Sequence, residues 1–530
     1  MTTVSPAAPA HIPDVLETLA QLPNDDVFTR PKLANAMLDV LPAEVWSDPK
    51  LKWVDPATKS GVFLREAAKR LMVGLESWEP DGHRRREHIL KDMLFGTSTT
   101  LINGEISRRS LYQSKDASGT DVKDDGLRSI IVEMNSRDGN VPYVATEHTI
   151  DPKTHACTIC RAPEALIREN REHFAYSFIH RTYPTKELFD MKFDVIVGNP
   201  PYQIGVDGSN RDRPIYQYFV DRAIALDPRY ILMITPSRWF AGGLGLNEYR
   251  EQRLNDRRMR ALVDYPKVYD AFPNVKIRGG VSYFLWDREH DGPCQVQTMW
   301  DGHPLGGPVE RYLNEWDVVV RRNEAVSIVR KVKAKGEATM DQTVSSRLPF
   351  GLQTTAHGAP SSEGLTDPIE FYGSKRRTWM ERSAIEVNRS TIDHYKVLLH
   401  RAYGEEGDPP FRVTASPTLI GPRTACSGTY LVIGGFAGQQ QARRLDHLLR
   451  TRFIRFLVQL RMNTQDIKRG TFAFVPELPL DRDWDDAALY ARYELTSEEI
   501  TFIESQVRKM SDGEVAAPTV DADDDEAEQE

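Results

Sequence analysis

The sequence predicts an α/β fold whose first part is built on one doubly wound, mostly parallel sheet. Three observations support this prediction: a strand, tight turn and helix at 51–75, a short β-branched run at 193–198, and another apolar run at 229–236. Segments with helical periodicity separate these runs. Short buried strands that alternate with helices are typical of parallel sheets, because each parallel pair needs a long crossover connection. We therefore expect one sheet to contain all three strands.

The first expected helix starts close to residue 30. Thr29 is a suitable N-cap, and Pro31 falls in the first turn, where its missing N–H costs nothing. Apolar residues then recur at helical spacing at Leu33, Ala34, Met37, Leu38 and Leu41. An ordinary capped helix explains this pattern. The functional alternative is that Phe28 and Thr29 close over a bound cofactor.

The strand, turn and helix at 51–75 contain a candidate ligand-binding turn. Small residues let the backbone approach a ligand, and the start of a helix offers free N–H groups. The carboxylate of Asp55, at the end of the strand, suits the amino or ribose part of a cationic cofactor. The residues assigned to this turn are Asp55, Pro56, Ala57, Ser60 and Gly61.

The run at 193–202 joins a buried strand to a rigid tip. The strand must end at the two prolines, since proline lacks the N–H that a ladder needs and restricts the residue before it. Along the tip, Asn199 offers a side-chain carbonyl, Pro200 a backbone carbonyl and Tyr202 a flat ring. Two acceptors aimed at the hydrogens of a ring amine would localise its lone pair, and the tyrosine ring would stack on the base. The alternative is a strand followed by an ordinary proline turn.

The Asn199-Pro200-Pro201-Tyr202 run resembles the N-P-P-Y catalytic motif of the N6-adenine methyltransferases that use S-adenosylmethionine. The Asp-Pro-Ala-x-x-Ser-Gly-x-Phe run at 55–63 resembles their cofactor motif, and residues 27–29 resemble their N-terminal capping motif. The order of these motifs, followed by a long C-terminal part, is similar to the gamma class of DNA N6-adenine methyltransferases. Within that class the chain most resembles the methylase domain of type II restriction-modification enzymes, over roughly residues 24–288.

The resemblance implies a Rossmann-like S-adenosylmethionine-dependent methyltransferase sheet at 1–320 with an insert at about 113–170, a mixed target-recognition domain at 321–510, and a disordered acidic tail at 511–530. It implies methyl transfer from S-adenosylmethionine to N6 of a flipped adenine in double-stranded DNA, as the modification component of a restriction-modification system. The implied catalytic residues are Asn199, Pro200, Pro201 and Tyr202. The implied cofactor-binding residues are Phe28, Thr29, Asp55, Pro56, Ala57, Ser60 and Gly61.

Two other functions remain open. A protein-glutamine methyltransferase would use a similar tip, because a carboxamide is also a planar amine, although the long basic C-terminal half argues against it. A non-catalytic DNA-recognition subunit would fit two departures from the family pattern. Lys59 replaces the usual glycine, so either the turn is wider or the lysine points outward. After the second strand, residues 97–100 are Ser and Thr, and the first acid that could bind the ribose hydroxyls is Glu105. By position, His180 is the candidate contact for the adenine ring.

The expected insert contains a cysteine pair. Cys157 and Cys160 have the Cys-x2-Cys spacing that is half of a zinc site, and His148 and His155 are near in sequence. Because there is no second cysteine pair, ordinary surface thiols are the preferred interpretation, and we assign no metal ligand. Four cysteines in 530 residues do not make a disulfide framework.

Three segments after the tip bear on DNA binding or on the sheet. The loop at 205–213 either closes over a flipped base or is a simple connector. Residues 250–260 are expected to form a basic helix that is solvated or contacts phosphate. The run at 280–286 is expected to be the closing antiparallel edge of the sheet.

From about residue 320 the composition changes to short strands punctuated by Gly and Pro, which predicts a mixed second domain. Lys375, Arg376 and Arg377 are interpreted as a solvated loop. Between 440 and 470, basic residues far outnumber acidic ones, and we expect the arginines to stay free to meet DNA phosphates. These basic residues are Arg443, Arg444, Arg450, Arg452, Arg455, Arg461, Lys468 and Arg469.

The net charge of −9 does not exclude DNA as a partner. Residues 511–530 hold nine acidic residues and no basic ones, so the rest of the chain has no net charge and can form local basic faces. No apolar run reaches membrane-spanning length and no leader segment is recognisable, so we expect a cytoplasmic protein. No nuclease motif stands out, which leaves room for a separate restriction endonuclease partner.

Overall fold

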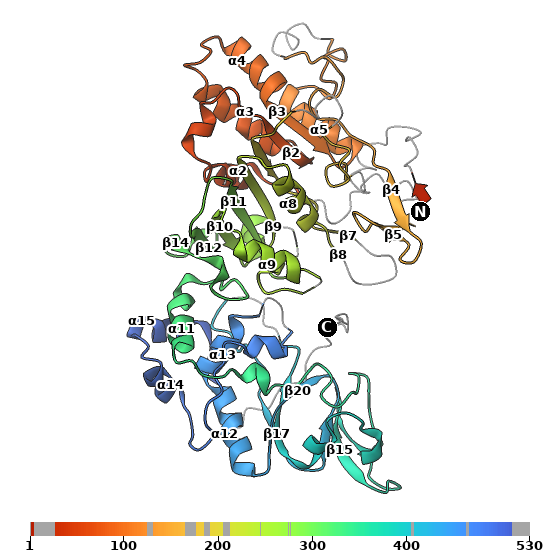
Figure 1. Cartoon of the computed structure of the whole chain (residues 1–530), viewed down its shortest axis with the longest axis vertical. Helices are drawn as coiled ribbons and strands as arrows, with labels where there is room; N and C mark the ends of the chain where they lie inside the picture. The colour runs from red at the N-terminus through yellow and green to blue at the C-terminus, as the bar shows by residue number, and fades with distance from the viewer. Residues whose placement is uncertain are drawn as a thin grey trace. The chain divides into compact units, whose positions relative to one another are not determined.

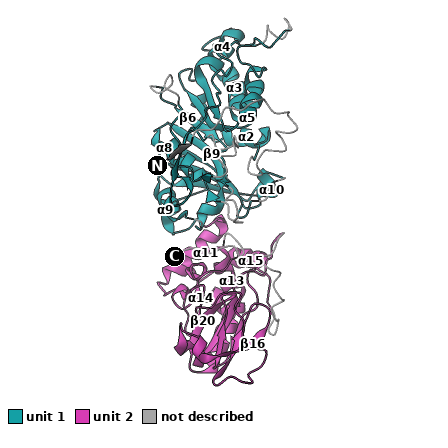
Figure 2. Cartoon of the chain, turned by 90° about the vertical axis from the view of Figure 1, so that its right-hand side faces the viewer, with its two compact units in different colours: residues 1–319, 525–530 teal, residues 320–524 magenta. Residues whose placement is uncertain are grey.

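The structure is a computed structural model, and Figure 2 shows it as two compact units divided between Val319 and Val320. The loop at 205–212 and the acidic tail at 511–530 lie outside the described residues. The structure describes residues 2–4, 27–123, 131–164, 176–184, 191–204, 213–243, 245–273, 275, 277–403, 408–462 and 466–510.

The first unit is organised around a nine-stranded sheet (Figure 1). The strand order is β13-β12-β10-β11-β9-β6-β2-β3, with β14 paired to β12. Strands β3, β2, β6 and β9 are parallel neighbours, as in a doubly wound fold. The predicted α/β fold with a Rossmann-like sheet is confirmed. The strands are β2 Trp53–Thr58, β3 Leu94–Ser98, β6 Val195–Gly198, β9 Tyr230–Pro236, β10 Met259–Tyr265, β11 Val281–Asp287, β12 Cys294–Trp300, β13 His303–Pro304 and β14 Val309–Arg311.

Strand β6 shows that the sheet is covered on both faces. Val195 and Val197 belong to one hydrophobic core, whereas Ile196 belongs to another. Alternate residues of a strand point to opposite faces, so the two cores lie on opposite sides of the sheet. Helices α2, α3 and α5 contribute to the first core, and α8 and α9 to the second. The helices of this unit are α2 Pro31–Leu38, α3 Val62–Gly74, α4 Gly82–His88, α5 Leu101–Tyr112, α8 Tyr216–Ala225, α9 Asn247–Asn255 and α10 Val268–Ala271.

The parallel pairing of β2 with β6 brings the two sequence motifs together. Val54 lies opposite Ile196 in this pair, so the carboxyl ends of both strands open at the same edge of the sheet. The turn at 55–61 and the tip at 199–202 therefore leave the sheet side by side. The crevice outside the carboxyl ends of parallel strands is where ligands bind in folds of this kind.

The last predicted strand is antiparallel but does not close the sheet. Strand β11 lies between β9 and β10 and is antiparallel to both. All seven residues of β11 are buried, as expected of an interior strand. The prediction of an edge strand was wrong, because β12 pairs beyond β10 and β14 pairs with β12 later in the chain.

The basic helix predicted at 250–260 ends earlier, at Asn255. The next segment turns into β10, because Asp256 accepts a hydrogen bond from Trp286 Nε1 at 3.0 Å and pairs with Arg258 at 2.7 Å. Arg253 on the helix is buried. Arg253 therefore serves the fold of the unit, whereas the side chain of Arg258 remains 42% exposed.

The insert contains a small sheet. Strand β4 (His148–Asp151) pairs with β5 (Ala156–Cys157) and with β1 (Thr2–Val4), in both cases antiparallel. Before β4, the chain runs along the free edge of β3, where Gly96 N–H donates to Asn140 O at 2.9 Å. The described residues of 113–147 form no helix or longer strand of their own.

The second unit combines two three-stranded sheets, β16-β15-β19 and β18-β17-β20, with a group of helices. Its mixed architecture agrees with the predicted fold class, whereas its role in target recognition stays a prediction. No helix in the described part of the chain is long and apolar enough to cross a bilayer. The elements are α11 Asn323–Ala334, β15 Pro368–Tyr372, β16 Arg377–Glu381, β17 Tyr395–His400, β18 Thr418–Ile420, β19 Thr424–Cys426, β20 Tyr430–Phe436, α12 Gln439–Arg450, α13 Arg452–Gln459, α14 Asp486–Arg492 and α15 Ser497–Gln506.

Candidate active site

The three motifs singled out in the sequence meet at one backbone oxygen. The carbonyl of Val27 accepts a hydrogen bond from Asn199 Nδ2 at 2.8 Å and another from Lys59 Nζ at 3.3 Å. The second hydrogen of the Asn199 amide points to Thr29 Oγ1 at 3.1 Å. The capping segment, the ligand-binding turn and the proline tip thus form one cluster, although up to 172 residues separate them in sequence.

The side chain of Asn199 is held in a single orientation. Both of its contacts use the amide nitrogen, and the residue is only 4% exposed. Its Oδ1 is buried and has no hydrogen-bond partner among the described residues. A buried acceptor left unpaired costs on the order of 1–3 kcal/mol, so the cluster holds an oxygen that a ligand N–H would satisfy.

The rest of the tip is also covered. Pro200 and Pro201 are buried, and the Tyr202 ring belongs to the first hydrophobic core. Burial raises the pKa of Tyr202 well above its ordinary value, so this side chain is neutral. The Asn199 side chain beside the Tyr202 hydroxyl opposes this rise in pKa. The sequence predicted an open ring for stacking, and in this structure the ring is packed instead.

Asp55 lies beside strand β6 as well as in its own turn. Its Oδ1 accepts a hydrogen bond from the Ala57 N–H at 3.1 Å. A Cβ added to Gly198 would lie 2.8 Å from the same oxygen, so the carboxylate occupies the space that this glycine leaves. Burial raises the pKa of Asp55 to about 7, while the Ala57 N–H and the charge of Lys59 oppose the rise. The group is therefore poised to ionise when a cation approaches.

The turn itself is tight. Gly61 has φ +71°, and a Cβ there would lie 3.0 Å from the backbone of Ser107, so both the conformation and the space favour glycine. The Ser107 hydroxyl donates to the carbonyl of Lys59 at 3.2 Å. Lys59 is buried, and its ammonium points inward to the capping segment. Of the two alternatives for this residue, an outward-pointing lysine is therefore wrong, and its charge lies close to Asp55.

A pocket of about 550 Å³ opens next to this cluster. Of the predicted cofactor residues, Phe28, Thr29 and Ser60 line it, whereas the other four and Asn199 are not among its lining residues. The rest of the lining comes from four separate segments of the chain. These residues are Val27, Arg30, Pro31, Val62, Arg65, Ser110, Phe272, Pro273 and Val275.

No carboxylate follows β3 at the place where the family pattern has an acid. The hydroxyl side chains of 97–100 are buried and bonded within the fold. Thr100 caps α5 by accepting from the Asn103 N–H at 3.1 Å, and Thr97 Oγ1 lies 3.0 Å from Ser177 Oγ. These hydroxyl groups bond within the fold and do not supply the acid that would bind a ribose.

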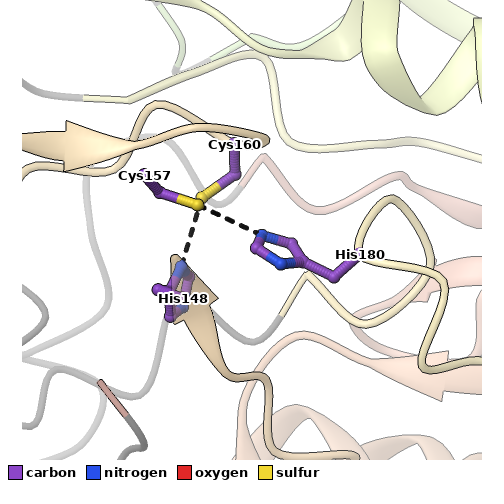
Figure 3. Close-up of side chains that lie close together, drawn as sticks. All are labelled: His148, Cys157, Cys160 and His180. Atoms are coloured by element: carbon purple, nitrogen blue, oxygen red, sulfur yellow. Dashed lines mark hydrogen bonds between the residues drawn. The ribbon is translucent and has the colours of Figure 1, made fainter. Parts of the chain in front are cut away.

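The cysteine pair of the insert lies in a second polar cluster. The ligand atoms of His148, Cys157, Cys160 and His180 all lie within 4.8 Å of one another (Figure 3). Both cysteines are buried, so their interpretation as surface thiols was wrong. His155 is exposed and contacts Glu164 instead. The ring of His180 is taken up by this cluster, which replaces its position-based assignment to the adenine ring.

The basic residues at 440–470 are mostly bonded within the second unit. Arg455 is 1% exposed and donates to the carbonyls of Arg412 at 2.7 Å and Arg508 at 2.8 Å. Arg450 pairs with Asp446 at 2.9 Å. The expectation that these arginines stay free to meet phosphates is wrong for both. Their partners are backbone carbonyls and a carboxylate that the linear pattern does not reveal.

Several solved structures are similar to the chain at low identity. A modification subunit of a putative type I restriction enzyme from Vibrio vulnificus YJ016 is 14% identical, with a TM-score of 0.32, covering 54% of this chain and 51% of that one. The DrdV–DNA complex is 10% identical, with a TM-score of 0.43 and coverages of 91% and 57%. A nuclease-deletion mutant of the type ISP enzyme LlaGI is 11% identical, with a TM-score of 0.45 and coverages of 90% and 46%. The chain thus spans about half the length of these proteins.

Sequence comparison gives the stronger result. Residues 92–272 match the Eco57I restriction-modification methylase family. An uncharacterized adenine-specific methylase from Mycoplasma pneumoniae (strain ATCC 29342 / M129 / Subtype 1) is 33% identical over 340 residues, which cover 60% of this chain and 80% of that protein. The chain therefore belongs to the family of adenine-specific methylases that is found in restriction-modification systems.

Proposed function

We propose that this chain transfers a methyl group from S-adenosylmethionine to N6 of an adenine flipped out of double-stranded DNA, as the modification component of a restriction-modification system. The observation that carries the proposal is the Asn199 side chain. Its nitrogen is fixed by Val27 and Thr29, and its buried oxygen has no partner among the residues that the structure describes. An acceptor held in this way is ready for the N–H of an amine.

The chemistry needs such an acceptor. The N6 lone pair of adenine is delocalised into the ring, which makes the amine a poor nucleophile. Hydrogen bonds from its two N–H groups to Asn199 Oδ1 and to the Pro200 carbonyl would draw the nitrogen toward tetrahedral geometry. Preset acceptors lower the barrier because they need no reorganisation during the reaction. The amine is paired inside a duplex, so the base must leave the stack to reach them.

The residues near the tip fit a cationic cofactor. Asp55 is a buried carboxylate, and burial raises its pKa to about 7 even with the positive charge of Lys59 nearby. Phe28, Thr29 and Ser60 line the adjacent pocket, where they would hold the bound molecule. When bound, S-adenosylmethionine supplies an electrophilic methyl carbon on a positively charged sulfur. Asp55 would hold the positive amino part, and the turn at Gly61 would let the backbone come close.

The capping segment must move before a base can enter. Asn199 and Tyr202 are 4% and 5% exposed, and the contacts of Asn199 with Val27 and Thr29 lie across the tip. We assign residues 27–29 the role of a cover that shifts when DNA binds. The second unit would supply target recognition, with exposed basic residues such as Arg376 and Arg443 meeting the DNA backbone. A restriction endonuclease would be a separate partner.

The test is transfer of a tritiated methyl group to DNA by the purified full chain. We expect wild-type protein to label double-stranded DNA and Asn199→Ala to lose at least about 10²-fold in rate, the effect of removing one preorganised hydrogen-bonding group. Asn314→Ala, an exposed asparagine of the same unit, is the matched control and should keep full activity.

Two other results would overturn the proposal. Labelling of protein substrates in place of DNA would indicate a protein-glutamine methyltransferase. DNA binding without any heat of cofactor binding in calorimetry would indicate a non-catalytic recognition subunit. Full activity of Asn199→Ala on DNA would refute the role of Asn199 alone.

A further inference from the structure

The second polar cluster of unit 1 joins three separate pieces of chain. His148 lies on β4, Cys157 is the last residue of β5, Cys160 lies in the turn that follows β5, and His180 lies in the described segment 176–184. Figure 3 shows both imidazole rings directed at the two sulfur atoms. The four potential ligand atoms lie within 4.8 Å of one another, and both cysteines are free thiols.

The distances are those of a tetrahedral metal site. Cys160 Sγ lies 3.4 Å from His148 Nδ1, and Cys157 Sγ lies 3.9 Å from His180 Nε2. Zinc–sulfur and zinc–nitrogen bonds of about 2.3 and 2.0 Å at tetrahedral angles would separate sulfur from nitrogen by about 3.5 Å. Both observed sulfur–nitrogen distances lie within a few tenths of an ångström of this separation.

The backbone of the cysteine turn is shaped to present both sulfurs. The Ile159 N–H donates to Cys157 Sγ at 3.4 Å, which favours the thiolate that a metal requires. The Arg161 N–H closes the turn by donating to the Cys157 carbonyl at 3.0 Å. Arg161 itself has φ +62°, a left-handed conformation that is uncommon for a residue with a side chain. A turn this constrained holds Cys157 and Cys160 on the same side.

Charge explains why such a set can be buried. Two thiolates and two neutral imidazoles balance a divalent cation, so the complete site carries no net charge into the interior. A purely redox role for the cysteine pair would not explain why both sulfur atoms contact histidine rings. Sulfur and imidazole ligands in a tetrahedral set select zinc among the common divalent ions.

We propose that His148, Cys157, Cys160 and His180 bind a structural zinc ion. All four positions around the ion are filled by protein, which leaves none for a substrate or water. The ion would tie the segment 176–184 to the β4–β5 hairpin. That segment reaches the sheet through Ser177, which contacts Thr97 on β3, and through Tyr183, which stacks on Phe193 before β6. Zinc would therefore hold the insert against the sheet.

The first experiment is metal analysis of the full chain purified without chelator. We expect about one zinc per chain, as for a four-ligand structural site. Cobalt added after removal of the zinc should give the visible absorption of a tetrahedral sulfur-ligated ion. Zinc below about a tenth of an equivalent, together with failure of added zinc or cobalt to bind the reduced protein, would overturn the proposal.

Variants locate the ion. Cys160→Ser and His180→Ala should each lose most of the bound zinc, whereas His155→Ala should keep it. His155 is the matched control because it lies in the same hairpin but is exposed and outside the cluster. Equal zinc in wild type and in both ligand variants would place the ion elsewhere and refute this site.

A second measurement uses the wild-type protein and therefore tests the site even if the variants fail to fold. A thiol reagent is applied to folded wild-type protein before and after a chelator. Release of the ion should make two further thiols reactive, and mass spectrometry should find the label on Cys157 and Cys160. Cys294 and Cys426 are buried elsewhere and serve as internal controls. Labelling that does not change with the chelator would contradict a bound metal.

Discussion

The two polar clusters of the first unit are both buried, yet they differ in what they leave unsatisfied. The cluster around Asn199 is built at the carboxyl ends of parallel strands and keeps an acceptor oxygen that no described residue satisfies. The cluster around Cys157 is built on a hairpin and an irregular segment, and its four side chains face one another. An unmet hydrogen bond costs stability and persists where a ligand will satisfy it. A closed set stabilises the fold. The cluster around Asn199 is therefore suited to an incoming molecule, and the cluster around Cys157 to a structural role.

The largest expected effect contrasts the two clusters directly. Asn199→Ala should lower the methyl-transfer rate by about 10²–10³-fold, or about 3–4 kcal/mol in the barrier, while the thermal midpoint changes little. Cys160→Ser should do the reverse, lowering the thermal midpoint by several degrees at least, since metal-binding free energy is folding free energy. Rate assays and thermal melts of both variants check this. A large drop in the thermal midpoint of Asn199→Ala would contradict the division into a functional and a structural cluster.

Gly198→Ala should act on the first cluster through sterics. The added methyl group would lie 2.8 Å from Asp55 Oδ1 and displace the carboxylate. We expect a loss of about 1–3 kcal/mol in stability, typical of overpacking, together with weaker cofactor binding. Urea unfolding and calorimetry measure the two effects. Gly82→Ala is the control, because nothing lies within 4 Å of the position of its Cβ.

The pH dependence should report on Asp55. Its pKa is raised by burial, so the folded protein binds a proton that the unfolded chain has already released, and stability falls as pH rises toward 7. A cationic cofactor prefers the ionised form, so its affinity should rise by up to about tenfold per unit as pH increases toward 7, and then level off. Calorimetry at several pH values tests this. Asp55→Asn should remove both slopes, and an unchanged slope in that variant would assign the titration to another group.

The smallest effect is expected at Thr29. Thr29→Val removes one of the two hydrogen bonds that orient the Asn199 amide, while the Val27 carbonyl keeps the other. We expect a loss of about 1 kcal/mol in stability and a few-fold drop in rate. Thr29→Ser keeps the hydroxyl and should restore most of both. An activity equal to wild type in Thr29→Val would mean that Val27 alone fixes the amide.

The sequence predicted the central strands well, because β-branched runs bounded by Pro and Gly depend on local chemistry. It failed where the answer lies in distant partners. The local sequence pattern of β11 fits an edge strand and an interior strand equally well. Its interior position depends on the later strands β12 and β14, which extend the sheet beyond β10. The ring of His180, rather than that of nearby His155, meets the cysteines because the fold returns there 20 residues later. Arg455 looked free because carbonyls at 412 and 508 are invisible in a linear pattern.

The Val27 carbonyl has one further consequence. Lys59 and Asn199 both donate hydrogen bonds to the main-chain carbonyl of Val27, so exchanging the side chain at residue 27 leaves this acceptor in place. Variation at that residue should be tolerated as long as the backbone path is kept, whereas altering the path itself would release both motifs at once. The cluster should therefore tolerate a changed side chain at residue 27 but not a displaced backbone there, because both motifs depend on the same carbonyl oxygen.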